Sequence, residues 1–397
     1  MRAAPRWWLS PPAFLLCGGV SDQAQRVRVL PLAGVVLVAA AAIAVTFVSV
    51  APELEVPPQL FSDFEINVWE PGHAILDGRS PLVSVEADPN GGSVYPPAAQ
   101  LATLPFALLP HDVGLVLWLV TLGAAVALAL RLCGVSDWRV FAVALCSPPV
   151  IAGLAYANVS LLITLGLAAA WVWRDRNWRV ALVVGALLAG RLFLWPLLVW
   201  LVITGRTHAA AKSALAAVAM TTIGWAAVGF RDIGEYTDVV RTFASAYVDD
   251  GVSVASIASN LGLSSNAGTS IAFCAGLVAL TLAWRSREYD LESFAWACAA
   301  ALFASPVVWG HYNAVLLVPL ALSTPRLSRW WLAPYLTIPQ LTVAAEAGGR
   351  ILDAAAGIAF ALVTPIRCRG VRALPLGGSD TGLAPPRPSP VDAERLA

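Results

Sequence analysis

The residues of this chain whose types and spacing best suit chemistry lie in a polar segment, residues 52–97, which follows the first long apolar run. Acidic side chains and one imidazole recur along it: Asp63, Glu65, His73, Asp77, Glu86 and Asp88. A carboxylate held against apolar surface can gain proton affinity and act as a general base. Asp63 is the first candidate for that role. The competing interpretation is that Asp63 belongs to the cap of a helix that carries Glu65.

Two basic side chains interrupt apolar sequence further along the chain. Arg191 stands alone within GALLAGRLFLWPLLVW, where a charge is costly unless it is paired or faces water. Its planar guanidinium fork suits a phosphate group. Alternatively, Arg191 extends to the membrane interface. His311 interrupts an apolar hairpin at SPVVWGHYN. It is either a functional imidazole or a structural hydrogen-bond donor.

The composition places the chain among membrane proteins. Of its 397 residues, 58% are hydrophobic and 13% are charged, and the mean hydropathy is +0.72. Soluble domains average about 45–50% apolar and about 25% charged residues. Apolar runs near the ~20 residues that a spanning helix needs recur throughout the chain. We therefore expect an all-α, polytopic membrane protein. The six cysteines show no metal-ligand spacing and are expected to be buried, so no metal site is predicted.

Basic loops set the expected orientation, because short cytoplasmic loops are rich in Arg and Lys. This rule predicts about twelve spans with both termini in the cytoplasm. The basic turns that determine the scheme lie at residues 131–139, 174–179, 206–212, 285–287, 326–329 and 367–372. The predicted parts are a cytoplasmic arm at 1–28, a transmembrane domain at 29–366 with outer loops at 52–97 and 230–268, and a disordered cytoplasmic tail at 367–397.

This topology gathers the remaining polar side chains on the outer side of the membrane. They come from both outer loops and from the outer ends of spans: Asp63, Glu65, His73, Tyr95, Asn158, Ser160, Arg191, Arg231, Asp232, Glu235, Asp238, Asn260, His311 and Asn313. Ionisable groups that gather at one face of a helical bundle indicate a functional site there.

Motifs of several other protein classes do not occur in the sequence. It has no Walker A loop, GxGxxG turn, HExxH helix or GxSxG elbow. Nucleotide-driven transport, dinucleotide chemistry and zinc proteolysis are therefore unsupported. No nucleic-acid partner is expected.

Several segments together resemble glycosyltransferase family 87, the polyprenyl-phosphate-dependent mannosyltransferases of actinobacteria, which have a multi-span GT-C fold. The matching segments run in the family's order: DFEINVW at 63–69, AILDGRSP at 74–81, YPP at 95–97, ANVSLL at 157–162, Arg191 to Pro196, the stretch near Asn260, and SPVVWGHY at 305–312. The chain departs from the family pattern at three positions. Arg191 replaces the usual lysine, Ala157 a glycine, and Tyr312 a second histidine.

The resemblance implies a GT-C fold and a single, inverting displacement at a sugar's anomeric carbon. Asp63 would be the catalytic base, and Arg191 and His311 would neutralise the phosphate of a polyprenyl-phosphate sugar. Weaker substrate-binding candidates are Glu65, Tyr95, Asn158, Asn260 and Asn313. The sugar is expected to be mannose, and the acceptor a glycolipid or cell-envelope glycan. The site would face the cell exterior from a multi-pass protein of the plasma membrane, and no metal or cofactor is expected.

Two other classes remain open at this point. A transporter or flippase could line its pathway with Arg191 and His311. Transporters, however, generally place polar sites near the bilayer midplane and often contain inverted repeats. Here the polar residues gather at the predicted outer ends of spans, and no convincing internal repeat is found. The departures at Ala157 and Tyr312 also leave open a non-catalytic scaffold.

Overall fold

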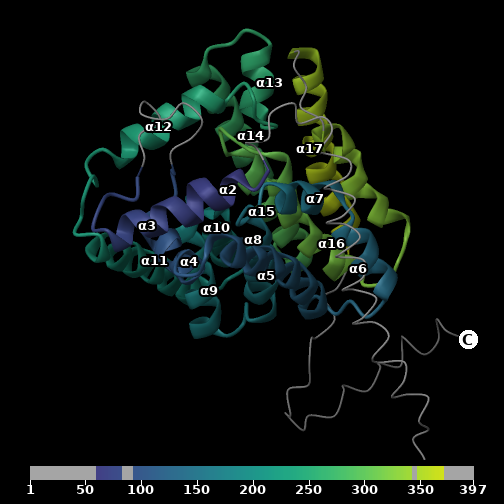
Figure 1. The fold of residues 1–397 in the computed structure, drawn as a ribbon. Helices are drawn as coiled ribbons and strands as arrows, with labels where there is room; N and C mark the ends of the chain where they lie inside the picture. Colours follow the sequence, from purple (N-terminus) through teal and green to yellow (C-terminus); the bar gives the residue numbers. More distant parts are fainter. Residues whose placement is uncertain (1–59, 83–92, 342–346, 371–397) are drawn as a thin grey trace, which may run out of the picture.

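The computed structural model describes residues 60–82, 93–341 and 347–370, and within them the regular structure is entirely helical. This confirms the all-α prediction for the described part of the chain (Figure 1). The predicted arm at 1–28, the first predicted span at about 29–50, Glu86 and Asp88, and the tail from residue 371 lie outside the described residues.

The first described helix carries the candidate base. It consists of α2 (Ser62–Phe64), a π-helical turn η2 (Glu65–Trp69) and α3 (Glu70–Leu76). The residue that precedes it, Phe61, has a left-handed backbone with φ 62° and makes no side-chain cap. Asp63 therefore lies in the first turn of the helix and is not its cap residue. Gly78, with φ 66°, follows the helix, in a conformation that favours glycine.

The next helices lead from the first loop into the apolar body. They are α4 (Pro97–Ala107), α5 (His111–Leu132), α6 (Trp138–Leu145) and α7 (Pro148–Ala155). Between α6 and α7 the axis bends by 57°. Pro148 has no N–H group and disfavours a helical backbone at the preceding Ser147, which is extended with ψ 145°. The apolar stretch at residues 139–155, expected from the sequence to form one span, is therefore a bent pair of helices.

A tight hairpin occupies the middle of the chain. It consists of α9 (Asn177–Gly190), a 3₁₀ turn η3 (Leu192–Leu194) and α10 (Pro196–Ile203). Helix α8 (Ser160–Val172) precedes it and α11 (Thr207–Ala227) follows it. Helices α9 and α11 pack closely at Gly185, which has no side chain. A Cβ atom at this position would come within 2.6 Å of the Ala216 side chain. Arg191 lies where α9 ends and the chain turns back.

The predicted outer loop at 230–268 contains two short helices and leads into a long one. These are α12 (Tyr236–Tyr247), α13 (Val254–Asn260) and α14 (Ser265–Arg285). No side chain of α12 is fully buried, and the helix lies at the edge of the ribbon (Figure 1). Its first residue, Tyr236, donates a hydrogen bond to the Val94 carbonyl at 3.2 Å, and its last, Tyr247, contacts the Trp309 ring. Helix α12 thus bridges the two segments that precede Tyr95 and His311.

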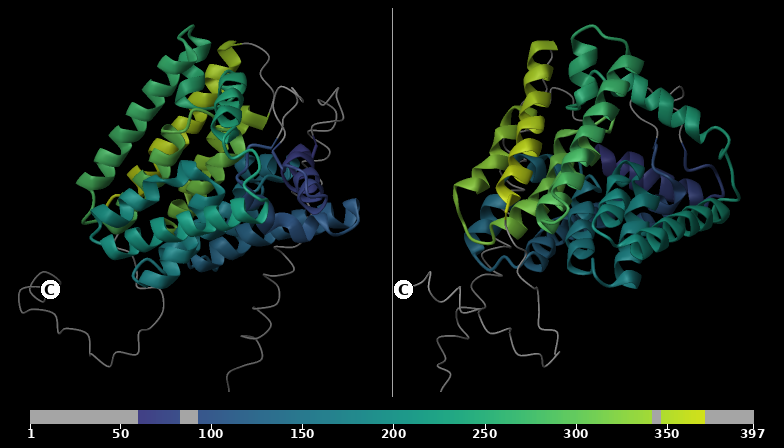
Figure 2. Two further views of the ribbon diagram at one scale, coloured as in Figure 1. Left: turned by 90° about the vertical axis from the view of Figure 1, so that its left-hand side faces the viewer. Right: turned by 180° about the vertical axis from the view of Figure 1, so that it is seen from behind.

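The remaining elements form the most buried part of the molecule. They are α15 (Asp290–Phe303), the 3₁₀ segment η4 (Gly310–Leu316), α16 (Leu317–Ser323), the 3₁₀ segment η5 (Arg329–Leu341) and α17 (Ala347–Cys368). Alanine-rich α15 is buried along nearly its whole length and packs against α10, α14 and α17. In both views of Figure 2, α14 and α17 rise away from α5 and α11.

Three described helices are long and apolar enough to cross a membrane: α5, α14 and α17. The bent pair α6–α7 would be a fourth if it forms one span. Shorter apolar helices occupy Ser160–Val172, Asn177–Gly190 and Leu192–Ile203. These features are those of a membrane protein. The scheme of about twelve spans remains a prediction, since several predicted spans are short or broken helices.

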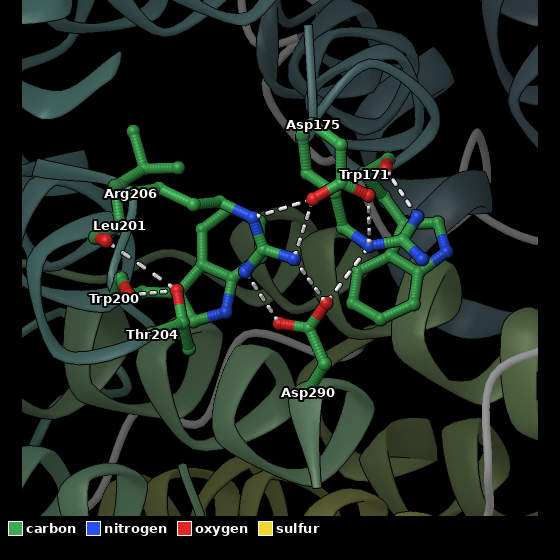
Figure 3. A network of polar contacts seen from close by, with 8 residues as sticks. Trp171, Asp175, Trp200, Leu201, Thr204, Arg206 and Asp290 are labelled. Carbon is green, nitrogen blue, oxygen red and sulfur yellow. Dashed lines mark hydrogen bonds and ion pairs between the residues drawn. The ribbon is translucent and has the colours of Figure 1, made fainter. Parts of the chain in front are cut away.

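At the end of the α9–α10 hairpin opposite Arg191, an ion network joins three turns (Figure 3). Arg206 donates two hydrogen bonds to the Asp290 carboxylate, at 2.9 and 2.7 Å, and a third to Asp175 at 2.9 Å. Arg174 donates to the same Asp290 carboxylate at 2.8 Å and lies over the Trp171 ring. We call Arg174, Asp175, Arg206 and Asp290 the Asp290 network. Its ion pairs link the turns that precede α9, α11 and α15.

Candidate active site

Backbone hydrogen bonds fix the position of Asp63. The Phe61 N–H donates to the Ala155 carbonyl at 2.8 Å, and the Asp63 N–H donates to the Tyr156 carbonyl at 3.1 Å. Both acceptors lie at the end of α7, where carbonyl groups lack partners within their own helix. The candidate base is therefore attached to a buried helix far along the sequence.

The Asp63 carboxylate accepts one hydrogen bond on each oxygen. Asn67, four residues later on the same helical face, donates to Oδ1 at 2.9 Å, and Asn158 donates to Oδ2 at 2.7 Å. Burial raises the pKa of Asp63 above its ordinary value, while the Asn158 bond, the Arg191 charge and the Asn67 bond oppose that rise. Asp63 is thus a carboxylate of raised proton affinity, held in a fixed orientation.

A strained turn presents Asn158. Ala157 precedes it with φ 55°, a left-handed conformation that costs a residue with a side chain roughly 1–2 kcal/mol. The Ala157 carbonyl accepts a hydrogen bond of 2.7 Å from the Trp118 indole. The Asn158 Oδ1 accepts from the Ser160 N–H at 2.7 Å, which leaves Nδ2 directed at Asp63 and at the Tyr95 hydroxyl, 3.3 Å away. The glycine of the family pattern at position 157 would adopt this backbone without strain.

Arg191 lies in the break between α9 and η3. Its backbone is extended, with φ −150° and ψ 93°. The guanidinium carbon stacks on the Tyr95 ring, 3.6 Å from its centroid. Among the described residues Arg191 forms no ion pair, and its buried Nε has no hydrogen-bond partner. A cation with unused donors in a buried site is suited to bind an anion.

His311 lies in η4 and is 3% exposed. Burial, followed by the charge of Arg191, lowers the pKa of His311 to about 3. The ring contacts Tyr312 and Tyr156, with centroids 5.0 and 5.8 Å apart, and within the described chain its Nε2 has no partner. The imidazole is therefore neutral at physiological pH. It can offer a phosphate a hydrogen bond, but not the positive charge expected from the sequence.

Five sequence candidates thus lie in one cluster, which we call the Asp63 cluster: Asp63, Tyr95, Asn158, Arg191 and His311. Sequence reasoning missed Asn67, Tyr156 and Tyr312, which pack among them. The spacing of Asn67, four residues after Asp63 in a predicted helix, was the available signal. Tyr312 had been noted as a departure from a family motif, and Tyr156 carried no signal.

Glu65 does not face this cluster. Its carboxylate contacts the His111 imidazole, with Oε2 and Nε2 2.9 Å apart, beside the Trp69 ring. Two residues along a helix correspond to a rotation of roughly 200°, so Glu65 and Asp63 point to opposite sides. Glu65, grouped with Asp63 by the sequence, therefore lies on the other side of the helix, against His111.

Two weaker candidates hold the structure together locally. Asn260 donates to the carbonyl groups of Asp249 and Ser256, at 3.0 and 2.9 Å, and so closes the end of α13. Asn313 donates to the Gly310 carbonyl at 3.2 Å and to the Gln340 side chain at 3.1 Å, tying η4 to η5. The structure places neither side chain against Asp63 or Arg191.

The cluster combines a carboxylate of raised pKa with a cation that has an unused donor. A carboxylate of raised pKa can take a proton, and an unpaired arginine beside it can bind a group that gains negative charge. In the parts of the chain that the structure describes, no three His, Cys, Asp or Glu side chains are arranged to hold a metal ion.

Comparison with known proteins identifies one family. No curated protein and no solved structure matches the chain. The family model of glycosyltransferase family 87 matches residues 94–309, more than half of the chain. The matched region includes Tyr95, Asn158 and Arg191, and Asp63 and His311 flank it in the sequence. The resemblance read from short motifs is therefore confirmed, and the chain belongs to glycosyltransferase family 87.

Proposed function

We propose that the protein is an inverting, membrane-embedded glycosyltransferase that moves a sugar, expected to be mannose, from a polyprenyl-phosphate donor to a glycolipid or cell-envelope glycan. The observation that carries this proposal is the half-buried Asp63 carboxylate, of raised pKa, beside an arginine that forms no ion pair among the described residues. Family membership supports glycosyl transfer over the transporter and scaffold alternatives.

The chemistry is a single displacement. The acceptor hydroxyl oxygen forms a bond to the anomeric carbon as Asp63 Oδ1 or Oδ2 takes the hydroxyl proton. The bond between that carbon and the phosphate oxygen breaks, and its electron pair stays on the phosphate. Attack opposite the leaving group inverts the configuration, so a β-linked donor gives an α-linked product. The hydrogen bonds from Asn67 and Asn158 hold the carboxylate in place during the transfer.

The positive charge of Arg191 suits a phosphodiester bound on its side of the cluster. Arg191 supplies one positive charge, and His311 is neutral. A polyprenyl-phosphate sugar carries one negative charge, and the leaving polyprenyl phosphate gains a second as the bond breaks. Arg191 and the neutral His311 N–H would stabilise that developing charge, which is the kind of interaction that usually contributes most to catalysis.

We also propose that Asp63 faces the cell exterior, on the side opposite the Asp290 network. The basic turns near Arg174 and Arg206 support this orientation. Single cysteines at Asp77 and at Asn177, both exposed, would report it in a background without native cysteines. An impermeant maleimide applied to intact cells should label only the cysteine at position 77. Labelling of both positions from outside would overturn the orientation.

The decisive test of the mechanism is the pair Asp63→Asn and Glu65→Gln, two isosteric changes on opposite sides of one helix. Loss of a general base removes about 10²–10⁴-fold of the rate. Asp63→Asn should therefore lower kcat by that factor and leave donor binding nearly unchanged, since a base acts in the transition state. Glu65→Gln should be mild. A folded Asp63→Asn protein that turns over at the wild-type rate would disprove the assignment.

A further inference from the structure

Tyr312, which the mechanism above does not use, is buried beside Arg191 with only 7% of its surface exposed. Its ring stacks on Phe193, with centroids 5.3 Å apart and planes 11° from parallel. Phe193 follows Arg191 by two residues in the sequence, so Tyr312 packs on the same irregular segment that carries the arginine. The structure thereby joins η4 to the break after α9.

Two tyrosine rings flank the Arg191 guanidinium. Its carbon lies 3.6 Å from the centroid of Tyr95 and 5.5 Å from that of Tyr312. Such cation–π contacts hold a guanidinium in a defined orientation without using its N–H groups. The arginine is therefore positioned by aromatic faces, and its donors remain for a ligand.

Tyr312 also brings a phenol hydroxyl close to Arg191, whose guanidinium carbon lies 5.5 Å from the centre of the ring. A tyrosine hydroxyl has one hydrogen to donate in addition to its acceptor lone pairs. A phenol beside the guanidinium can therefore donate that hydrogen to an oxygen of the anion that Arg191 binds. Any anion held by Arg191 would lie within reach of it.

We propose that Tyr312 binds the sugar donor, with its hydroxyl donating a hydrogen bond to an oxygen of the lipid phosphate held at Arg191. Tyr312 stands where the family pattern has a second histidine, and like a neutral imidazole it can donate a hydrogen bond without carrying a charge. This inference rests on the proposed function, because it assumes that the phosphate of a polyprenyl-phosphate sugar binds beside Arg191.

The test measures binding of farnesyl phosphate, with farnesol as the uncharged control, to the full-length protein in detergent. Tyr312→Phe keeps the ring that stacks on Phe193 and removes only the hydroxyl. It should raise the Kd for farnesyl phosphate about 10- to 100-fold, the size expected for a hydrogen bond to a charged group. The Kd for farnesol and the Tm should not change. Tyr312→His, which restores an aromatic donor, should recover most of the phosphate affinity.

Tyr335→Phe is the matched control, because the Tyr335 hydroxyl donates to the Val143 carbonyl at 2.9 Å, away from the Asp63 cluster. It should leave the Kd for farnesyl phosphate unchanged. The inference is overturned if Tyr312→Phe binds farnesyl phosphate as tightly as wild type, or if Tyr312→His is no better than Tyr312→Phe. A wild-type protein that binds farnesyl phosphate and farnesol equally would instead refute the phosphate site itself, and with it both proposals.

Discussion

Arg206 and Arg191 lie at opposite ends of the α9–α10 hairpin and have opposite surroundings. Arg206 directs its donors at two carboxylates, those of Asp290 and Asp175, and its charge is matched within the Asp290 network. Arg191 lies against tyrosine rings, forms no ion pair among the described residues and keeps a buried Nε without a partner. The same side chain is thus saturated at one end of the hairpin and unsaturated at the other.

The different surroundings of Arg206 and Arg191 indicate different roles, stabilisation of the fold for Arg206 and ligand binding for Arg191. A saturated ion network has little to offer a ligand, since its donors and acceptors are already used. An unsaturated buried arginine reduces the stability of the empty protein and recovers that energy when an anion binds. Changes in the Asp63 cluster should therefore reduce turnover without unfolding the protein. Changes in the Asp290 network should lower the unfolding free energy and leave turnover per folded molecule unchanged.

Among the variants that test this comparison of two arginines, the largest effect is expected for Arg191→Ala. Removal of the cation should lower kcat/KM by about 30- to 5,000-fold, corresponding to ~2–5 kcal/mol when the partner charge is left desolvated. Arg191→Lys keeps the charge but loses the two-pronged fork, so it should retain part of the activity. Neither variant should lower the Tm of the protein without ligand. Wild-type turnover in Arg191→Ala, measured with a polyprenyl-phosphate sugar, would show that Arg191 is an interfacial anchor.

Asp290→Asn, in the Asp290 network, should lower the stability of the protein. It leaves Arg174 and Arg206 without their shared partner in a half-buried position, where the Asp290 side chain is 23% exposed. The expected cost is about 1–3 kcal/mol of unfolding free energy, below the cost for a fully buried pair because water screens part of it. Turnover per folded molecule should not change. Asp238→Asn, in an exposed pair with Arg241, is the control and should leave the Tm unchanged.

The stability of the protein should depend on His311 below neutral pH. The pKa of His311 is about 3 in the folded protein against an ordinary 6.5, so the unfolded chain binds a proton that the folded chain does not. The unfolding free energy should therefore fall as the pH is lowered from 6.5 toward 3. His311→Gln should flatten the decline in Tm between pH 6.5 and 4.5. The exposed His208→Gln serves as the control, and an unchanged slope in His311→Gln would contradict the prediction.

The smallest effect is expected for Ala157→Gly. Glycine relieves the left-handed strain at φ 55° but gives the unfolded chain more freedom, and the two terms partly cancel. The net gain should be ~0.5 kcal/mol, with turnover within about twofold of wild type, since the Asn158 side chain keeps its place. A clear loss of stability would show that the Ala157 methyl group contributes packing that outweighs the strain.

The sequence predicted the helical class. It also predicted that Asp63, Tyr95, Asn158, Arg191 and His311 lie on one side, because the basic loops determine on which side each helix end lies. It did not predict the direction of Glu65. Asp63 and Glu65 could be placed on opposite faces only after residues 62–76 had been recognised as a helix with a defined start. It also did not predict the bend at Ser147, because the apolar run there continues across the break. The neutral state of His311 depends on burial by residues far along the chain, which no local pattern reveals.

The bridge formed by α12 has a mechanical consequence. Tyr236 ties one end of the helix to Val94, beside Tyr95, and Tyr247 ties the other to Trp309, close to His311. None of its side chains is fully buried, so the cost of local opening at α12 is low compared with that of the alanine-rich core around α15. A substrate that stiffens the segment at Tyr95 would therefore restrain the segment at His311 through this helix, and slow amide exchange along α12 would record the coupling.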